Sequence, residues 1–321
     1  MKKTKLLLIL SFTLFTLFLA EFTGFFSSRI VKEKSLPPEV YFCPNNCSAP
    51  LVRLINSAND SIDCAFYTLD SKEIIDALKN QKSKLRLILD KHSEELKDFD
   101  AIKNYGTRQL MHDKFCVIDN KIVITGSFNP TERSKKDYND VMIIHSNYLA
   151  ENYEDEFNEL FDGQFGSGSK VKYPLIYLNG KKLENYFCPE DSCSEHVMDV
   201  LNSADRGIYF MTFVFTHPGI ADTLIKKKGI DIKGVLERSM KNKWSQYERL
   251  KKSGINIKLD GSKHFMHEKV FIVDNKTVIT GSFNPTRSAD LRNDENLLII
   301  HDEAVAKQYL GQFERVWKLA S

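Results

Sequence analysis

A stretch of 21 residues that occurs twice constrains the fold of this chain of 321 residues more than any other feature. Residues 111–131 read MHDKFCVIDNKIVITGSFNPT, and residues 266–286 read MHEKVFIVDNKTVITGSFNPT. Fifteen of the 21 positions are identical, at a constant offset of 155 residues, which is almost half the chain length. Two such copies indicate a duplicated fold in which two equivalent half-sites meet in space.

The duplication extends well beyond this stretch, because YFCP at 41–44 occurs again at 186–189. In both halves, stretches with helical spacing of apolar residues alternate with strand-like runs, which is typical of the α/β class. We therefore predict a first half at 41–165, a linker rich in Gly and Ser at 166–182, and a second half at 183–321.

Each copy of the stretch carries a histidine and, two residues later, a lysine: His112 and Lys114 in the first, His267 and Lys269 in the second. Alternate side chains of a strand point to the same face, so each pair shares a face. Lysine is rarely buried without a partner, and a core role therefore fits these pairs poorly. A single histidine of this kind would most often be structural, but the repetition of the whole set makes all four residues candidate catalytic residues.

The turn that ends each copy adds groups that can bind an oxyanion. Ser127 and Ser282 supply hydroxyl groups at a strand end, and Asn129 and Asn284 supply amide groups two residues later. Together with the two lysines, these side chains predict a pocket for a phosphate group.

Four further positions of the motif are predicted to be structural. Asp119 and Asp274 can cap the tight turns that follow them, and Gly126 and Gly281 stand directly before the serines. Each copy has a single His and does not resemble a metal site, so we predict neither a metal nor a cofactor.

A carboxylate follows each histidine at the same spacing: Asp140 lies 28 residues after His112, and Glu295 lies 28 residues after His267. A carboxylate bonded to one imidazole nitrogen fixes the tautomer and leaves the other nitrogen free to react. We predict this role for both carboxylates; the alternative is that they are ordinary turn residues.

Two histidines that face each other across a phosphodiester can divide the chemistry between them. One attacks phosphorus and forms a phosphohistidine, while the other protonates the leaving oxygen and then deprotonates the incoming water. The scheme requires no metal and no cofactor.

The spacing H-x-K-x4-D-x6-G-S-x-N resembles the signature of the phospholipase D superfamily, and both copies match it in full. The resemblance spans about residues 41–321. It implies two α/β halves, each with a mixed β-sheet flanked by helices, packed as a pseudo-twofold pair with one active site at their junction. NDEN at 293–296 is similar to the segment that supplies the histidine-orienting carboxylate, whereas Asn139-Asp140-Val141 offers Asp in place of Glu.

The resemblance leaves the substrate open, because the superfamily includes lipases, lipid synthases and nucleases. Compact halves resemble the small bacterial endonucleases of this superfamily, which pair two chains; here one chain supplies both halves, which favours a monomer. We therefore predict a metal-independent phosphodiesterase that is a nuclease acting on DNA or RNA. The alternatives are a phospholipase D or phosphatidyltransferase acting on phospholipid, and an inactive module that binds phosphate.

The two halves differ in charge, since residues 27–165 carry a net charge of −5 and residues 166–321 a net charge of +5. A basic second half can follow a nucleic-acid backbone. Trp244 and Tyr247 lie beside several of its lysines and can stack on bases, although both also fit the apolar face of a helix. The alternative is an ordinary solvated surface. The lysines in question are Lys226, Lys227, Lys228, Lys241, Lys243, Lys251 and Lys252.

The N-terminus is typical of a secretory signal or an uncleaved signal-anchor, because three lysines precede an apolar run at 6–20. Ala20 can occupy the position before a cleavage site, but Phe18 then stands where a small residue is required. We therefore predict a signal-anchor and linker at 1–40 that hold the protein in the cell membrane, with the catalytic domain outside the cytoplasm. A cleaved signal would instead give a secreted protein.

Six cysteines bear on the compartment, and four of them lie in short loops at equivalent places: Cys43, Cys47, Cys188 and Cys193. In an oxidising compartment each loop can close a small disulfide, and a four-cysteine metal site is the weaker alternative. Cys64 and Cys116 fall within apolar strand-like runs and are predicted to be buried free thiols.

Overall fold

The computed structural model describes residues 30–93, 96, 99–104 and 109–321. The predicted signal-anchor and its cleavage point lie outside these residues. Within them, no helix is both long and apolar enough to cross a membrane.

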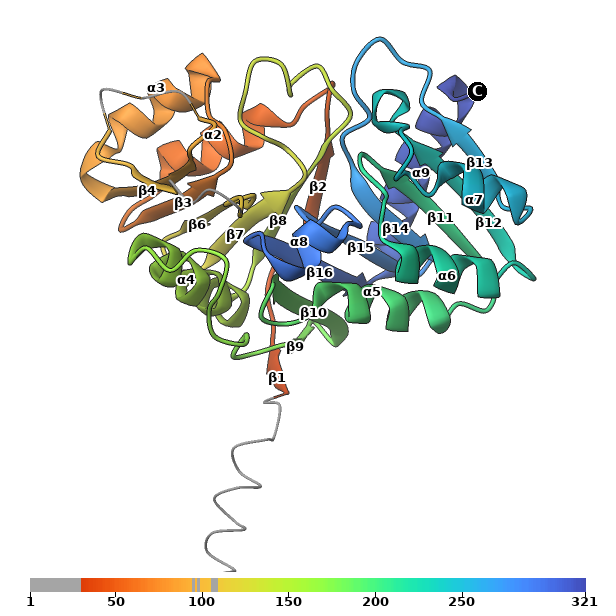
Figure 1. The fold of residues 1–321 in the computed structure, drawn as a ribbon. Helices are drawn as coiled ribbons and strands as arrows, with labels where there is room; N and C mark the ends of the chain where they lie inside the picture. The colour runs from red at the N-terminus through yellow and green to blue at the C-terminus, as the bar shows by residue number, and fades with distance from the viewer. Residues whose placement is uncertain (1–29, 94–95, 97–98, 105–108) are drawn as a thin grey trace, which may run out of the picture.

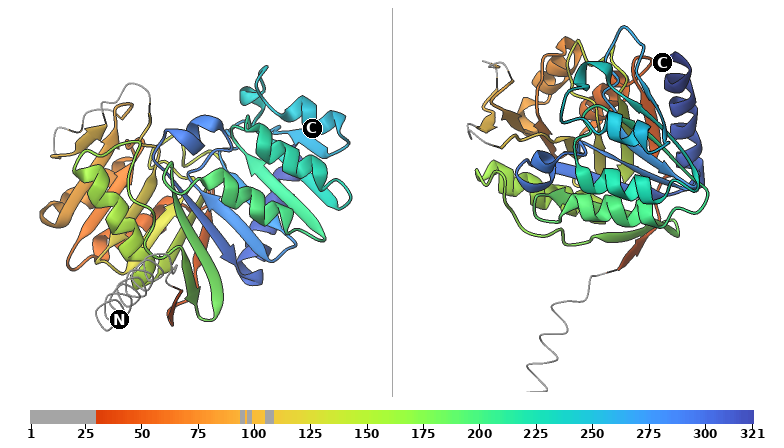
Figure 2. Two further views of the ribbon diagram at one scale, coloured as in Figure 1. Left: turned by 60° about the horizontal axis from the view of Figure 1, so that its bottom comes forward. Right: turned by 45° about the vertical axis from the view of Figure 1, so that its right-hand side comes forward.

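Two mixed β-sheets form the framework of the molecule (Figures 1 and 2). The first sheet has the order β2-β8-β7-β6-β3-β4-β5, and the second has the order β1-β9-β10-β16-β15-β14-β11-β12-β13. The last seven strands of the second sheet repeat the first sheet strand for strand, which confirms the predicted pair of duplicated α/β halves. The strands of the first sheet are β2 (Glu39–Phe42), β3 (Ile62–Phe66), β4 (Leu85–Asp90), β5 (Ile102–Asn104), β6 (Lys114–Ile118), β7 (Ile122–Gly126) and β8 (Asp140–His145). Those of the second are β1 (Val31–Glu33), β9 (Leu175–Leu178), β10 (Lys181–Cys188), β11 (Gly207–Thr212), β12 (Asp231–Leu236), β13 (Asn256–Leu259), β14 (Lys269–Val273), β15 (Thr277–Gly281) and β16 (Glu295–His301).

Helices cover both faces of each sheet, because each sheet is apolar on both sides. One face of each sheet packs on the short helices of its own half, and the other faces share one core with the long helices α4 and α9. The helices of the first half are α2 (Ser48–Ser57), α3 (Lys72–Asn80) and α4 (Asn147–Phe161). Those of the second are α5 (Cys193–Asn202), α6 (Pro218–Lys226), α7 (Tyr247–Lys252), α8 (Arg287–Leu291) and α9 (Glu303–Leu319).

The shared core joins the two halves through aromatic contacts that cross between them. Tyr153 of α4 lies edge-on to Phe115 of the first sheet and to Phe187 of the second, with ring centroids 4.9 and 5.0 Å apart. Tyr309 of α9 contacts Phe42 of the first sheet at 5.1 Å. These buried contacts hold the two sheets in a fixed relation and so position the residues at their junction.

The hairpins β6–β7 and β14–β15 turn at Asp119-Asn120 and Asp274-Asn275, where all four residues have positive φ. The two aspartates were predicted to cap these turns, but their carboxylates bond the backbone of another loop instead. The carboxylate of Asp119 accepts backbone N–H bonds from residues 59–61 at 2.6–3.1 Å, and that of Asp274 accepts bonds from residues 205–207 at 2.7–2.9 Å. Each aspartate thereby ties the start of the neighbouring strand to the hairpin.

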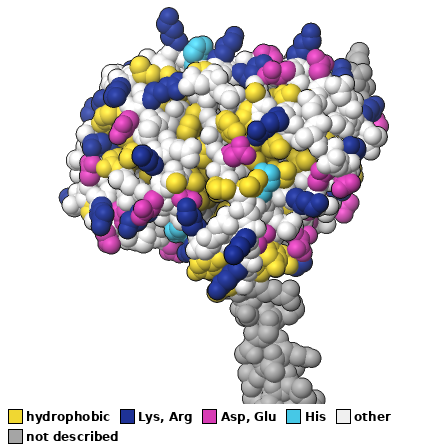
Figure 3. Space-filling model, turned by 180° about the vertical axis from the view of Figure 1, so that it is seen from behind, with side chains coloured by type: hydrophobic (Ala, Val, Ile, Leu, Met, Phe, Trp, Pro, Cys, Tyr) yellow, Lys and Arg dark blue, Asp and Glu magenta, His cyan; other side chains and the backbone are white. Residues whose placement is uncertain are grey.

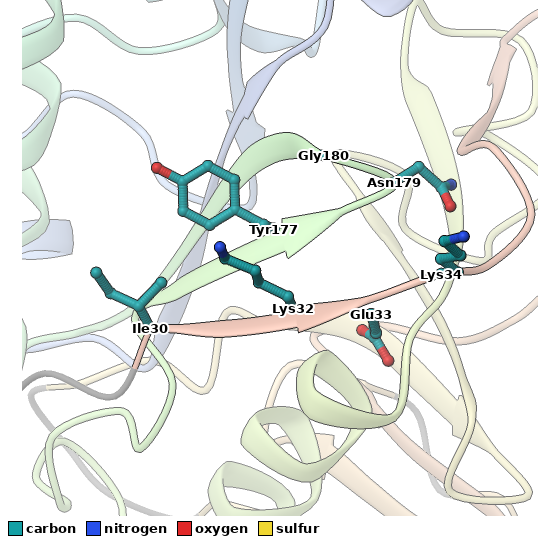
Figure 4. Close-up of a pocket in the computed structure, with 7 residues that line it drawn as sticks. All are labelled: Ile30, Lys32, Glu33, Lys34, Tyr177, Asn179 and Gly180. Carbon is teal, nitrogen blue, oxygen red and sulfur yellow. The ribbon is translucent and has the colours of Figure 1, made fainter.

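The stretch at 166–182, predicted as a linker, contains β9 and the first residues of β10. Strand β1 runs parallel to β9 and extends the second sheet. Lys32 lies over the ring of Tyr177, with 5.9 Å from its Nζ to the centroid, and Glu33 points to the other side (Figure 4). There the Glu33 carboxylate accepts hydrogen bonds from the Ser146 hydroxyl and from the backbone N–H of Asn147, so the described N-terminus is attached to both halves.

Three disulfides are present, and two of them, Cys43–Cys47 and Cys188–Cys193, are the predicted loop pairs. The prediction of free thiols for Cys64 and Cys116 is wrong, because these residues form a third disulfide. They lie directly opposite each other on the antiparallel strands β3 and β6, with 4.1 Å between their Cα atoms. The pairing register that brings them together cannot be read from the local sequence.

The surface seen from behind carries interspersed basic and acidic side chains, with apolar side chains gathered toward the middle (Figure 3). The opposite net charges of the two halves therefore do not divide this face into one acidic and one basic patch.

Candidate active site

Both histidines stand just before a central strand, at the junction of the two halves. The residues around them form short parallel bridges across the junction, Met111 with Asp294 and Tyr138 with Met266. The backbone N–H of His112 donates to the Asp294 carbonyl, and that of His267 donates to the Tyr138 carbonyl, both at 2.9 Å. Each histidine is thus held by backbone from the other half.

The carboxylate of Glu295 orients His112, which belongs to the other half. His112 Nδ1 lies 2.7 Å from Glu295 Oε2. The same carboxylate accepts hydrogen bonds from the Ser282 hydroxyl at 2.7 Å and from the Asn293 amide at 3.3 Å, and it is fully buried. With its Nδ1–H donated to Glu295, the imidazole keeps the lone pair of Nε2 free to react.

His267 has a different partner. Its Nδ1 lies 2.8 Å from the amide oxygen of Asn139. A neutral amide fixes the same tautomer as a carboxylate, but it stabilises a positive charge on the ring less. The two imidazoles therefore differ in chemistry although their backbones are equivalent.

The predicted bond between Asp140 and an imidazole is not found. Asp140 instead accepts hydrogen bonds from the hydroxyl groups of Ser127, Thr280 and Tyr309, each at 2.6 Å. These three bonds hold the side chain, which is one methylene shorter than that of glutamate, within the core. Asp140 thus links the halves, and the adjacent Asn139 takes the place beside the ring.

Lys114 and Lys269 are almost fully buried, with 3% and 2% of their surface exposed. Lys114 Nζ donates to the backbone carbonyl of His112, and Lys269 Nζ donates to that of His267 at 2.5 Å. Lys269 Nζ also lies 3.2 Å from both ring nitrogens of His267. Each Nζ therefore lies beside the histidine of its own half.

Burial and mutual repulsion shift the pKa values of these groups. Burial, aided by both lysine charges, holds the pKa of His112 and of His267 well below the usual range, so both rings are neutral near pH 7. Burial also lowers the pKa of Lys114 to about 8 and places that of Lys269 well below its usual value. Burial raises the pKa of Glu295 to about 7.

The serines position carboxylates rather than offering free hydroxyl groups. Ser127 Oγ donates to Asp140 Oδ1 and accepts from the Asp140 backbone, and Ser282 bonds Glu295 and the Asn296 backbone in the same way. The phosphate contact predicted for the two hydroxyl groups therefore does not follow from this geometry.

The two asparagines remain candidates for phosphate binding. The side-chain oxygens of Asn129 and Asn284 are buried and have no hydrogen-bond partner among the described residues. Asn129 also lines the cavity beside His267. An amide oxygen only accepts hydrogen bonds, so a contact with a phosphate oxygen would have to come from the amide N–H groups of these side chains.

Sequence reasoning missed an aromatic residue beside each histidine. Tyr67 directly follows β3 and lies edge-on to His112, with centroids 5.0 Å apart; Phe213 directly follows β11 and contacts His267 at 4.6 Å. Each ring also lies near its lysine, 5.1 Å from Lys114 Nζ and 5.4 Å from Lys269 Nζ. The available signal was positional, since an aromatic residue follows the first central strand in both halves.

A cavity of about 350 Å³ opens beside His267 and takes its lining from both halves. His92 is a further missed residue in its wall, and its Nδ1 bonds the buried carboxylate of Asp90. Arg133 lies over the ring of Phe265, with 4.0 Å from its guanidinium carbon to the centroid. The lining is mostly polar: Thr68, Leu69, Asp70, His92, Ser93, Asn129, Thr131, Arg133, Ser134, Asp137, Phe213, Phe265 and His267.

Within the described part of the chain, no three His, Cys, Asp or Glu side chains are grouped so that they could hold a metal ion.

Comparison with known proteins identifies the family of this chain. The family model "Cardiolipin synthase, PLD-like domain" matches residues 51–161 and 197–317. A phospholipase D of Rickettsia conorii (strain ATCC VR-613 / Malish 7) is 34% identical over 141 residues, which cover 43% of this chain and 70% of that protein. The mitochondrial cardiolipin hydrolase of Xenopus tropicalis is 32% identical over 151 residues, which cover 45% of this chain and 70% of that protein.

The solved structure of phosphatidylserine synthase from Haemophilus influenzae Rd KW20 aligns with 88% of this chain and 87% of its own, with a TM-score of 0.67 and 13% identity. That likeness shows a common fold. Fold and paired histidines define a phosphodiester hydrolase in which two duplicated halves share one site. The chain belongs to the phospholipase D superfamily.

Proposed function

We propose that this protein hydrolyses nucleic-acid phosphodiesters through a phosphohistidine, with His112 as the nucleophile and His267 as the general acid and base. The observation that carries the proposal is the unequal support of the two rings. Nucleophilic attack places positive charge on the attacking imidazole, and the buried Glu295 carboxylate 2.7 Å from His112 stabilises that charge. The amide of Asn139 gives His267 no such counter-charge, so a protonated His267 gives up its proton more readily.

In the first step, His112 Nε2 attacks phosphorus, the P–N bond forms and the P–O bond to the leaving group breaks. His267 gives the proton on its Nε2 to the leaving oxygen. The free site disfavours protonated His267 because of burial and the lysine charges. A bound phosphodiester anion offsets those charges, so His267 takes up a proton when substrate binds.

In the second step, the now neutral His267 removes a proton from water, and the resulting hydroxide attacks phosphorus. The P–N bond breaks and His112 leaves as the neutral imidazole from which the cycle began. Lys114, Lys269 and the two motif asparagines stabilise the negative charge on the non-bridging oxygens in both steps.

The lining of the cavity beside His267 favours a nucleic acid as the substrate. Its walls are mainly hydroxyl, carboxyl, imidazole and guanidinium groups with two phenylalanine rings. Such a lining suits a sugar and a base, which have polar edges and flat faces, better than acyl chains. Hydrolysis of phospholipid or phosphatidyl transfer is the second candidate, because the relatives at 34% and 32% identity are named phospholipase D and cardiolipin hydrolase.

The location and assembly belong to the same proposal. The apolar run at 6–20 would hold the protein in the cell membrane with its catalytic domain outside the cytoplasm, and the three disulfides suit an oxidising compartment. A monomer suffices, because one chain supplies both histidines.

The division of roles is tested with single-turnover kinetics on bis(p-nitrophenyl) phosphate, whose leaving group departs without a general acid. We expect H267A to release one equivalent of nitrophenol and then stop, with the nitrophenyl phosphoryl group trapped on His112, because the base for the second step is missing. H112A should release none. Mass spectrometry of a digest kept at neutral or alkaline pH, where the P–N bond survives, locates the trapped group.

The opposite pattern, a burst in H112A with phosphate on His267, would reverse the two roles. Steady turnover by either variant would exclude the shared covalent mechanism. The natural substrate is identified by giving the same enzyme single-stranded DNA, single-stranded RNA, duplex DNA and phospholipid vesicles, each with and without EDTA. We expect the nucleic acids to be cleaved and EDTA to have no effect.

A further inference from the structure

An open groove of about 960 Å³ lies on the second half, next to the site but outside it. Its walls come from the start of α6, the segment at 242–246, α7 and the start of α8. Trp244 stands in it with 68% of its surface exposed, more than any other large apolar side chain among the described residues. The residues that line it are Thr216, Pro218, Asn242, Lys243, Trp244, Ser245, Gln246, Glu248, Arg249, Lys252 and Arg287.

The groove is positively charged after its ion pairs are taken into account. Glu248 is paired with Lys241 at 2.7 Å, and Arg249 is paired with Asp222 outside the lining. The structure gives the other three cations of the lining, Lys243, Lys252 and Arg287, no ion pair among the described residues. Lys243 Nζ lies 5.0 Å from the Trp244 ring centroid, so a cation and an aromatic face are presented together.

The groove is connected to the histidines by one short stretch of chain. Phe213 contacts the ring of His267, and Thr216, three residues later, lines the groove. The backbone N–H of Thr216 donates at 2.9 Å to the carbonyl of Pro285, the residue that follows Asn284. Three extended residues span about 10 Å, so a ligand that reaches from His267 into the groove must continue well beyond its reacting phosphodiester.

The equivalent place in the first half carries carboxylates at two of the positions that line the groove. Asp70 corresponds to Thr216, because its backbone N–H donates in the same way to the Pro130 carbonyl, at 3.1 Å. At the offset of 155 residues, Arg287 corresponds to Glu132. Lys135 is paired with Glu132 at 2.8 Å. The first half therefore has carboxylates where the groove has Thr216 and Arg287.

We infer that this groove binds a single-stranded nucleic acid on one side of the bond to be cleaved; the inference rests on the nuclease function proposed above. The exposed ring of Trp244 can stack only on a base whose face is free, which selects an unpaired strand. Lys243, Lys252 and Arg287 contact the phosphates of the same strand. The substrate strand would thereby extend from the histidines toward the second half only.

The test compares three proteins: W244A, the triple variant K243A/K252A/R287A, and the control K276A/K307A/K318A. The control removes the same number of positive charges from exposed positions outside the groove lining. The substrates are a thymidine oligonucleotide of about 12 residues, the dinucleotide, and bis(p-nitrophenyl) phosphate. We expect both groove variants to lower kcat/KM for the oligonucleotide, relative to the dinucleotide, by about ten-fold or more.

Salt dependence gives a second readout. Loss of three phosphate contacts should reduce the slope of log KM against log salt by about 2 for a single strand. The control should keep the wild-type slope and length preference. W244F, which retains a stacking face, should recover much of what W244A loses.

Each other result has a distinct meaning. If the wild type cleaves oligonucleotides and the groove variants keep its length preference, the groove is not a binding track, although the proposed function stands. If the wild type hydrolyses only bis(p-nitrophenyl) phosphate and cleaves no oligonucleotide, the proposal of a nuclease is wrong, and so is the proposal that the groove binds its substrate. Loss of binding to anionic phospholipid vesicles in the groove variants, with oligonucleotide cleavage intact, would assign the groove to a membrane surface instead.

Discussion

Glu295 and Asp140 occupy equivalent positions in the two halves, yet their side chains have different partners. Glu295 reaches an imidazole, whereas Asp140 is held by three hydroxyl groups in the core. A change of one methylene between the repeats is thus accompanied by a change from an orienting residue to a structural one. The two carboxylates thus carry the same charge at equivalent positions, but only Glu295 touches an imidazole.

The difference between these two carboxylates can be measured with E295Q and D140N. We expect E295Q to lower kcat/KM by about 10³-fold while the protein stays folded, because the positive charge that develops on His112 loses its counter-charge. D140N should reduce activity much less and lower Tm more, since it weakens bonds that join the halves. Hydrolysis rates and thermal melts of both variants provide the comparison, and equal losses of activity would contradict it.

The histidines and lysines could be singled out as candidates because the whole set occurs twice at the same spacing. The sequence could not predict Asn139 as the partner of His267, since the two lie 128 residues apart and meet only across the junction. The same holds for Glu295 and His112, which are 183 residues apart. A local pattern identifies reactive groups, but the packing of two sheets decides which groups meet.

At the scale of the elements, the close approach of strands β15 and β16 depends on a glycine. Gly281 ends β15 with a φ of +131°, and a Cβ atom there would lie 2.4 Å from the Asn296 carbonyl oxygen. Gly126 has the same relation to the Asp140 carbonyl oxygen in the first half, also at 2.4 Å. The glycine of the motif therefore serves the strand contact that places Ser282 and Glu295 next to each other.

G281A should destabilise the protein by about 3 kcal/mol or more, because the clash is with backbone and the φ is unfavourable for alanine. Calorimetry should then show a Tm lower by about 5–10 °C. G311A is the matched control: Gly311 lies in α9 with open space around it, so alanine should stabilise slightly. A G281A protein as stable as the wild type would show that the strands can separate at no cost.

The element order was predictable because hydrophobic periodicity and the duplication can both be read directly from the sequence. The third disulfide was not, since the register of β3 against β6 comes from the whole sheet. Strand β9 was hidden as well, because a stretch rich in Gly and Ser indicates a linker, and only its pairing with β1 and β10 makes it a strand.

At the scale of the whole molecule, the junction buries carboxyl groups that are not catalytic. Burial raises the pKa of Asp113 to about 7 and that of Glu268 to about 8. Asp113 accepts a hydrogen bond from the Asn296 amide, and Glu268 accepts one from the Gln312 amide, both at 2.7 Å. The fold thus keeps protons on groups that would be ionised in the unfolded chain.

This proton binding makes stability depend on pH in a defined direction. The folded pKa values of Asp113 and Glu268 are raised, so their contribution is complete below about pH 4 and is lost as the pH rises through 7–8. The opposite applies to Asp119 and Asp274: burial alone would raise the pKa of each, but backbone hydrogen bonds lower it, so their contribution is lost in acid. Stability should therefore be greatest at mildly acidic pH.

We expect Tm to fall by about 5 °C or more between pH 5.5 and pH 8.5 at constant ionic strength. E268Q should flatten this slope, because it removes one of the titrating groups. Differential scanning calorimetry across the pH range provides the measurement. A Tm that is constant or rises toward alkaline pH would show that these carboxyl groups are not protonated in the folded state.

Each imidazole ring is oriented by a side chain from the opposite repeat. This arrangement has a consequence for how such a site can evolve. Two identical subunits must give both rings the same neighbour, so any mutation that improves one ring for attack changes the other equally. A single gene that encodes both copies removes this constraint. The side chains beside the two rings, Glu295 and Asn139, can then differ, and so can the surfaces around them. The two halves of this chain share one strand order but differ in the side chains beside the two rings.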